Sequence, residues 1–375
     1  MLTVTKLGNG EYLIESVALG VEEYYLGLGE APGVWTGRWA AKLGLEGVVE
    51  ADDLRCLLDR RHPVTGVELA PRQKQTTVKA IDLTFSAPKS ASVLWAVGGD
   101  ASRVVVAAHV EAVEVALGFL EGKASVARRQ VGGVRGLVPM SGLAVAGFVH
   151  RTSREGDPQL HTHCLAVNLT ERIDGRVVAL DGRPLFVWAR AAGSVYQAEL
   201  QRALAARLGV LWGPDRNGTR EIDGFARGQL RVFSKRTVQI EGELLAVGAD
   251  GLADPGVRAR ADDLASLATR AAKDRGLTPA RLAERWDTEA GKAGLAVGRA
   301  LEERVCFREG SRARSAGRRS PGRWWTARPG CAATTLGSPR LMSSSTSAPC
   351  RPAGSRCRRS RVTSPGSFAR TWSSG

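Results

Sequence analysis

Alternation of apolar and polar residues predicts a strand with two distinct faces over residues 79–86. Side chains of a strand point to opposite faces in turn, so each face can be read from the sequence. The apolar face holds Ile81, Leu83 and Phe85, and the polar face holds Asp82, Thr84 and Ser86. We therefore expect this strand to bury one face and to present a carboxylate on the other.

Two further strands are predicted on either side of a short polar loop. Apolar runs cover residues 143–150 and 159–169, and the loop between them, residues 151–158, contains Gly156 and Pro158. Strand-like runs joined in this way are typical of an antiparallel hairpin. We expect the end of the first strand to lie beside the start of the second.

The remaining periodicity predicts helices and a few short strands. Helical spacing covers residues 11–28 (moderately), 52–60, 89–97, 101–121, 189–208 and 259–303. Short strands are expected at 177–180 and 210–212, and a hairpin around Gly132-Gly133 should join 125–131 to 134–138. Strands that arrive in hairpins and are interrupted by helices predict an α+β fold, an antiparallel sheet covered by helices.

Three of the five histidines of the chain lie within fourteen residues, at His150, His161 and His163. The spacing of two puts His161 and His163 on one strand face, and the predicted hairpin brings His150 to them. Three converging imidazoles form an open metal site with positions left for substrate. A His-x-His pair can also be a merely polar face, but the third histidine favours the metal. His109 lies in an apolar helical run and is expected to be a packed or surface residue.

The positive charge is concentrated at one end of the chain. A net charge of +15 would ordinarily suggest a nucleic-acid partner. Residues 306–375 hold 14 Arg, no Lys and one acid, a net +13, which leaves only +2 for residues 1–305. The total charge therefore gives little support to a DNA-binding function of the larger part.

The basic C-terminal segment also has an unusual composition. It lacks Lys, Asp, Asn, Gln, His, Ile and Tyr, and it contains four of the six cysteines and three of the nine tryptophans. A disordered basic arm would be expected to use Lys and Gln and to avoid Trp and Cys. We interpret residues 305–375 as a disordered tail and hypothesise that a frameshift near residue 305 replaced the native continuation.

Other motifs weaken competing classes of function. No Walker sequence Gly-x4-Gly-Lys-[Ser/Thr] occurs, so the sequence predicts no NTPase motor. Ser86 and Lys89 match the Ser-x-x-Lys pattern of acyl-serine enzymes, but the companion motifs Ser-Asp-Asn and Lys-Thr-Gly are absent. A zinc hydrolase would need a Glu beside the first histidine pair, and this chain has none there. With no run of 18 apolar residues and no signal-peptide pattern, a cytoplasmic location without membrane insertion is expected.

Together the motifs resemble the MobF (TrwC/TraI-type) conjugative relaxases, which belong to the HUH endonuclease class. The resemblance rests on the N-terminal tyrosines, on Asp82-Leu-Thr-Phe-Ser-Ala-Pro-Lys-Ser90, and on His150 followed by Gly156-Asp-Pro-Gln-Leu-His-Thr-His163 with Asn168. It extends to Phe233-Ser-Lys-Arg236 and to the region of Ala268-Thr-Arg270. Residues 1–304 are accordingly assigned as a relaxase domain.

The resemblance implies metal-dependent nicking and joining of DNA, specific for site and strand, at a plasmid origin of transfer. A tyrosine hydroxyl attacks the scissile phosphodiester, leaving a 5′-phosphotyrosine and a free 3′-OH. His150, His161 and His163 would hold a divalent ion, Mg²⁺ or Mn²⁺ first, with Zn²⁺ or Ni²⁺ as alternatives. Asp82 would orient a histidine or help to deprotonate the tyrosine.

The tyrosine pattern of this chain differs from that of many relatives. Tyr12 matches the position of the first nucleophile of the family, and Tyr24 and Tyr25 match the second pair. Many relatives carry a Tyr-Tyr doublet at the first position, where this chain has Glu11-Tyr12. Tyr12 is therefore our first-position nucleophile, and Tyr24 is preferred over Tyr25 for a second strand transfer.

The implied partner is single-stranded DNA at the origin of transfer, with relaxosome accessory proteins and a type IV coupling protein as further partners. Lys89, Lys235 and Arg236 are candidates for phosphate contacts. Four tryptophans are candidates for stacking on bases, although tryptophan is more often a core residue: Trp35, Trp39, Trp95 and Trp188.

Relaxases of this family usually continue into a helicase domain, and the sequence predicts none in this chain. The departure at the first tyrosine position and the missing helicase keep a second hypothesis open. In that hypothesis the protein is a truncated, inactive remnant that only binds origin DNA.

The frameshift hypothesis makes a prediction about the gene. Sequencing of the locus should reveal an intact reading frame, overlapping or following codon 305 in another phase, that encodes a further domain with Walker motifs. A locus without such a frame would contradict the hypothesis.

Overall fold

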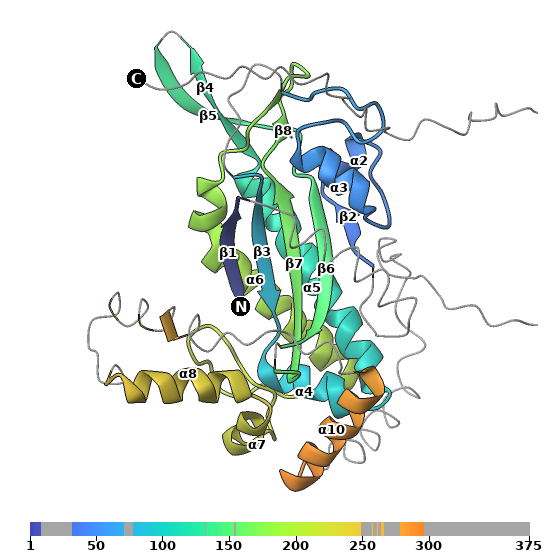
Figure 1. The fold of residues 1–375 in the computed structure, drawn as a ribbon, viewed down its shortest axis with the longest axis vertical. Helices are drawn as coiled ribbons and strands as arrows, with labels where there is room; N and C mark the ends of the chain where they lie inside the picture. Colours follow the sequence, from blue (N-terminus) through green and yellow to red (C-terminus); the bar gives the residue numbers. More distant parts are fainter. Residues whose placement is uncertain are drawn as a thin grey trace, which may run out of the picture. The chain divides into compact units, whose positions relative to one another are not determined.

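Five antiparallel strands form the central sheet, in the order β1-β3-β7-β6-β2 (Figure 1). The strands are β1 (Leu2–Leu7), β2 (Val34–Thr36), β3 (Ala80–Ser86), β4 (Val126–Val131), β5 (Val134–Pro139), β6 (Val145–Thr152), β7 (Pro158–Val167), β8 (Thr170–Glu171) and β9 (Val177–Val178). The strands β4 and β5, and likewise β8 and β9, form separate two-stranded sheets. The predicted α+β fold with an antiparallel sheet is confirmed.

This computed structural model describes residues 1–8, 32–70, 78–131, 133–153, 155–248 and 278–295, together with residues 257, 261, 264 and 265. All of them belong to one unit, Met1–Trp324. The described helices are α2 (Arg38–Lys42), α3 (Ala51–Leu58), α4 (Lys89–Val97), α5 (Ala101–Ala124), α6 (Arg183–Leu208), α7 (Arg227–Val232), α8 (Lys235–Ala246) and α10 (Pro279–Lys292). The helix predicted at 11–28 and the segment 305–375 lie outside the described residues.

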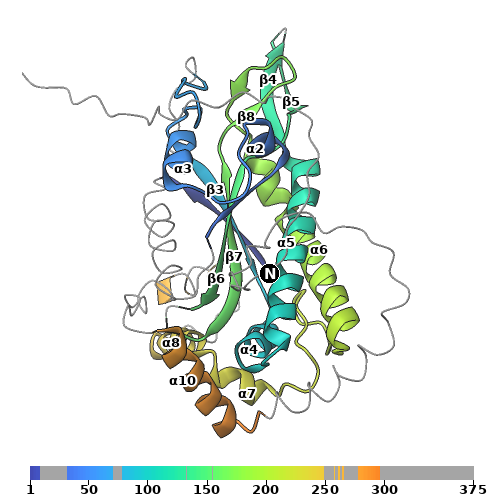
Figure 2. The ribbon, with the colours of Figure 1, turned by 90° about the vertical axis from the view of Figure 1, so that its right-hand side faces the viewer.

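The long helices α5 and α6 pack against one face of the sheet (Figure 2). The apolar face predicted for β3 lies on this side, because Leu83 and Phe85 are fully buried and Phe85 contacts Tyr196 of α6 at 5.5 Å between ring centroids. His109 of α5 is fully buried as well. Its Nδ1 lies 2.7 Å from the Tyr196 hydroxyl, and its Nε2 lies 2.8 Å from Thr162 Oγ1 of β7. A buried polar network thus links both helices to the sheet.

The opposite face of the sheet is covered in part by α2 and α3. Their buried side chains, with Trp35 and Trp39 among them, pack against Leu165 and Val167 of β7 and form one hydrophobic cluster. Trp35 and Trp39, which are 3% and 0% exposed, are therefore core residues. Because strand residues alternate, the cover over Leu165 and Val167 lies on the same face as His163 and His161, further along the strand.

Most predicted elements occur where the pattern placed them: the strand at 80–86, both hairpins and the helices α3, α4 and α5. The helix predicted at 189–208 begins earlier, at Arg183, with a proline in its first turn. The strand predicted at 210–212 is wrong. Only an isolated bridge joins Trp212 to Ile222, because Gly213 and Pro214 follow at once and proline cannot donate to a ladder.

Burial of His109 makes a prediction about stability and pH. Burial first, and then the nearby His161 and the chain's amino terminus, lower the pKa of His109 from 6.5 to about 3. The unfolded chain takes up this proton as pH falls below 6.5, whereas the folded protein does not take it up until about pH 3. This histidine therefore lowers the free energy of unfolding by about 1.4 kcal/mol for each pH unit through that window.

We expect the His109→Gln variant to lose stability less steeply than the original protein between pH 6.5 and pH 3. Urea unfolding at several pH values measures the two slopes. Equal slopes for the two proteins would contradict a buried neutral imidazole.

Candidate metal centre

Three histidines meet on the same sheet face as α2 and α3. Among the described residues, they lie on the part of this face that the two helices do not cover. His161 and His163 are two apart on β7, and the β6–β7 register places His150 directly opposite His161. The predicted hairpin and its convergence of imidazoles are therefore confirmed. Each of the three side chains is partly exposed, so the group is accessible from solvent.

The spacing of the three rings matches that of a ligand set. One nitrogen from each histidine lies within 4.8 Å of one from each of the other two. The ring centroids are 5.0 to 5.3 Å apart, and the rings stand edge to face. Three imidazole nitrogens this close to one another could hold one metal ion.

Asp82 and Thr84 of β3 fix the orientation of His163. His163 Nδ1 donates a hydrogen bond of 2.8 Å to Asp82 Oδ2, and Thr84 Oγ1 lies 3.1 Å from the same nitrogen. Thr84 also donates to Asp82 Oδ2 at 3.2 Å. The register explains this contact, since Thr84 is paired with His163 across the β3–β7 ladder. The polar face of β3, which the sequence indicates, is thus the support of the histidine cluster.

The hydrogen bonds also select which ring nitrogen is available to a metal. A carboxylate and a backbone carbonyl are acceptors only, so His163 Nδ1 must donate to Asp82, and His161 Nδ1 must donate to the Gln159 carbonyl at 2.8 Å. In the neutral imidazole the lone pair then resides on Nε2 of both residues. Such outer hydrogen bonds commonly fix the tautomer of metal-binding histidines.

Asp82 has one oxygen left over. Its side chain is 11% exposed, and Oδ1 is buried without a hydrogen-bond partner among the described residues. Most buried polar atoms in proteins are paired, so an unpaired carboxylate oxygen beside a histidine cluster indicates a functional site. This oxygen can accept a proton or a hydrogen bond from a bound group.

The basic residues proposed as DNA contacts are engaged within the protein. Lys89 Nζ donates to the carbonyls of Pro158 and Phe233, at 3.0 and 2.9 Å, and its burial lowers the pKa of its ammonium. Lys235 forms ion pairs with Asp157 and Glu289. Arg236 is the next residue of α8 and is partly exposed. With its ammonium held by two carbonyls, Lys89 is also poorly placed to activate Ser86 as in an acyl-serine enzyme.

The proposed nucleophiles Tyr12, Tyr24 and Tyr25 lie outside the described residues. Thr84 and Gln159, which hold the histidines in place, were not singled out from the sequence. The signal for Thr84 was present, because it follows Asp82 on the polar face of one strand. No signal pointed to Gln159, since its backbone carbonyl makes the contact.

The family assignment of the chain is clear from comparison with known proteins. A family profile described as TrwC relaxase matches residues 8–293. The multifunctional conjugation protein TraI of Escherichia coli is 33% identical over 277 residues, which cover 71% of this chain. The chain belongs to the TrwC relaxase family.

Solved structures of a relaxase of this family have the same fold. The conjugative relaxase TrwC in complex with OriT DNA, in a metal-free structure, superposes with a TM-score of 0.69 at 30% sequence identity. A metal-bound structure of the TrwC complex with OriT DNA gives a TM-score of 0.68 at 31% identity. Each match covers 80% of this chain and 100% of the other.

The match to TraI covers very different shares of the two proteins. The aligned part covers 15% of TraI, so this chain corresponds to a small portion of that relative. Among the helices in the described part of the chain, none is long and apolar enough to cross a membrane.

Proposed function

We propose that this protein nicks and rejoins one strand of DNA at a plasmid origin of transfer, through a metal-dependent tyrosine transesterification. The observation that carries the proposal is the group of His150, His161 and His163, with Asp82 behind it, in a chain of the TrwC relaxase family. The reported complexes of TrwC with OriT DNA support origin DNA as the partner.

The residues of the site are suited to a divalent ion. Three imidazoles, two of them oriented by hydrogen bonds from Nδ1, make a nitrogen donor set with room for further ligands. Our first assignment is Mg²⁺ or Mn²⁺, which prefer oxygen ligands such as phosphate and water at the remaining positions, and Zn²⁺ or Ni²⁺, which suit imidazole donors, are the alternatives. When bound, such an ion would polarise the scissile phosphate and stabilise the charge that develops on its oxygens. The metal-bound TrwC structure supports the same assignment.

The proposed nicking step uses the chain's own nucleophile and base. The Tyr12 hydroxyl oxygen forms a bond to phosphorus while the bond from phosphorus to the 3′-oxygen breaks, and the leaving 3′-oxygen takes a proton from water to become a hydroxyl. The phenol must lose its proton to become nucleophilic. Asp82 is our candidate acceptor because its Oδ1 has no partner among the described residues. Reversal of the step rejoins the strand, and no ATP is required.

A second strand transfer would use Tyr24, with Tyr25 as the less favoured alternative. We assign this chemistry to residues 1–304 and no function to residues 305–375. We propose that this protein acts in the cytoplasm. Relaxosome accessory proteins and a type IV coupling protein are its proposed further partners.

We favour an enzyme over an inactive remnant that only binds origin DNA. The carboxylate–histidine contact and the ligand spacing, which DNA binding alone does not need, are both present.

A covalent adduct is the direct test of the proposed reaction. The protein is incubated with Mn²⁺ or Mg²⁺ and a labelled single-stranded oligonucleotide from the transfer origin of the element that carries the gene. We expect a labelled band that resists denaturation. The Tyr12→Phe variant should form at least a hundredfold less of it, because removal of an enzyme's nucleophile generally lowers the reaction rate by that factor or more. A Tyr12→Phe protein with undiminished adduct would overturn this nucleophile, and absence of any adduct from the original protein would favour the remnant.

Removal of the Asp82 carboxylate should weaken metal binding. In Asp82→Asn the charge that orients His163 and favours its Nε2 lone pair is lost, so we expect a Mn²⁺ affinity lower by about 10- to 100-fold. Titration calorimetry measures this affinity. Asp59→Asn is the matched control, because Asp59 is an exposed carboxylate paired with Lys79 and lies apart from the histidines. Equal affinities of Asp82→Asn and the control would contradict the role of Asp82.

A further inference from the structure

The hairpin that carries the histidines is irregular at its turn end. His150 is paired with His161, but Thr152 is paired with Pro158, so the ladder shifts by one residue directly after His150. A bulge of this kind interrupts the ladder and bends the strand. Regular strand pairing therefore ends at the His150–His161 pair and does not fix the turn that follows it. The segment beyond the bulge must be held by other contacts.

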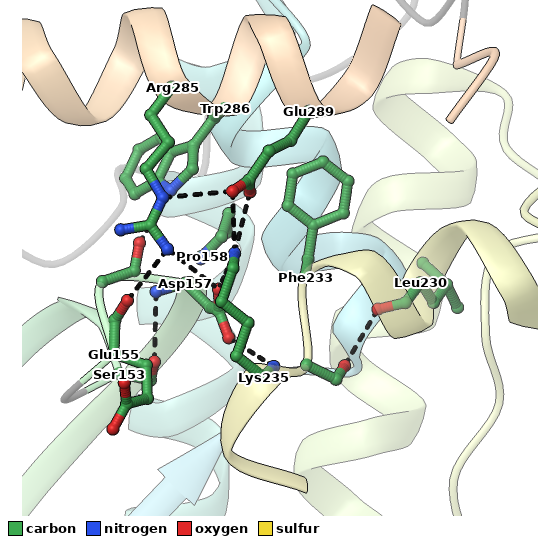
Figure 3. Close-up of polar contacts among 12 residues, drawn as sticks. Ser153, Glu155, Asp157, Pro158, Leu230, Phe233, Lys235, Arg285, Trp286 and Glu289 are labelled. Carbon is green, nitrogen blue, oxygen red and sulfur yellow. Dashed lines mark hydrogen bonds and ion pairs between the residues drawn. The ribbon is translucent and has the colours of Figure 1, made fainter. Parts of the chain in front are cut away.

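Asp157, the last residue of the turn, is the centre of those contacts (Figure 3). Its side chain is 1% exposed. Oδ2 accepts a hydrogen bond of 2.7 Å from the Lys235 backbone amide, and Oδ1 accepts one of 2.8 Å from Lys235 Nζ. The backbone of Asp157 closes the turn, since its carbonyl accepts from the Ser153 amide at 2.9 Å. One residue thus joins the turn to the start of α8.

Asp157 also acts as the N-terminal cap of α8 from a distant part of the chain. The residue at the N-cap position, Ser234, makes no side-chain cap, and its hydroxyl donates to the Leu230 carbonyl instead. The first amide of the helix, that of Lys235, is satisfied by Asp157. A carboxylate at this position is stabilised by the positive end of the helix dipole. The α8 terminus and the turn therefore stabilise each other.

Helix α10 completes the arrangement from the other side (Figure 3). Glu289 pairs with Lys235 Nζ at 2.9 Å and with Arg285 Nε at 3.1 Å. Arg285 also donates to the Glu155 carbonyl at 3.2 Å, and Trp286 Nε1 donates to the Gly156 carbonyl at 2.8 Å. Two successive carbonyls of the turn are thus held by α10, and a network of acidic and basic side chains around the buried Asp157 connects the two helices to it.

We propose that Asp157 is a positioning residue for the metal centre. Asp157 acts as part of a cluster that we name the hairpin clamp: Asp157, Lys235, Arg285 and Glu289. The clamp holds the β6–β7 turn against α8 and α10, and so keeps in place the end of the ladder at which His150 and His161 are paired, directly before the bulge. This inference rests on the proposed function, in which those histidines bind a divalent ion.

The same contacts give the clamp residues a role other than contact with DNA. Lys235 is bound by two carboxylates inside the protein, and its charge is needed there because Asp157 is buried. A buried carboxylate without a cation is strongly unfavourable, and so is a buried cation without its carboxylate. Loss of the Asp157 charge would therefore leave Lys235 with Glu289 alone of these two carboxylates, weaken the acceptor of the first α8 amide, and so loosen the turn.

The test compares two buried carboxylates at opposite ends of the sheet. Asp181, like Asp157, is buried and paired with two cations, Arg128 and Arg183, beside the β4–β5 hairpin. Both Asp157→Asn and Asp181→Asn should lower the melting temperature. Only Asp157→Asn should also lower the affinity for Mn²⁺, by about tenfold, the lower end of the range for residues that support metal ligands. Titration calorimetry gives the affinity, and the visible absorption of bound Co²⁺ reports on the ligand geometry, which should change only in Asp157→Asn.

The possible outcomes separate this inference from the proposed function. If the original protein binds no Mn²⁺ or Co²⁺, the proposed metal site fails, and the inference fails with it. If the original protein binds metal and Asp157→Asn binds it equally well, with an unchanged Co²⁺ spectrum, only the inference is overturned. Should Asp157→Asn not fold, Glu289→Gln decides the question, because it loosens the clamp from α10 and leaves Asp157 paired. If Glu289→Gln binds metal more weakly than Asp181→Asn does, the positioning role of the clamp is supported. If the two variants bind metal equally well, that role is overturned.

Discussion

The register of β6 against β7 is the constraint on which the candidate metal centre depends. It places His150 opposite His161, and strand alternation keeps His163 on the same face. A slip of one residue would turn the histidines of one of these strands toward the face that α5 and α6 cover. Thr162, between the two histidines of β7, contacts the buried His109. A slip would leave the Nε2 of this buried imidazole without Thr162, so the buried network on one face helps to select the register that the other face needs.

The division of labour between the two faces explains how a single strand serves both packing and chemistry. On one face β7 packs against α5 and α6. On the other it runs from Leu165 and Val167, under the cluster of α2 and α3, to the partly exposed histidines. The support for the histidines comes from a third strand, β3, through Asp82 and Thr84. The three histidines are therefore held by the sheet, with β3 behind them.

The parts of the site that are local in sequence were predictable, and the parts that depend on distant pairing were not. The histidine hairpin follows from two apolar runs and a short loop, and the polar face of β3 follows from alternation. That Asp82 meets His163 could not be derived from those patterns, because nothing in a strand's own sequence tells which strand it pairs with. Lys89 and Lys235 show the same limit. Each belongs to a basic motif that suggests phosphate, but their partners are two carbonyls and two carboxylates far away in the chain. The short strands β1 and β2 were missed, since edge strands of three to six residues carry little pattern.

The closeness of the three histidines in sequence has a consequence for how the protein folds. His150 and His161 are brought together by closing one short loop, which costs little chain entropy and is fast. Asp82 and the helices of the hairpin clamp join from positions 68 or more residues away from the histidines along the chain, and such non-local contacts are expected to form late. The ligands can therefore assemble before the groups that orient them, and the last stage of folding is the one that converts a cluster of histidines into a defined site.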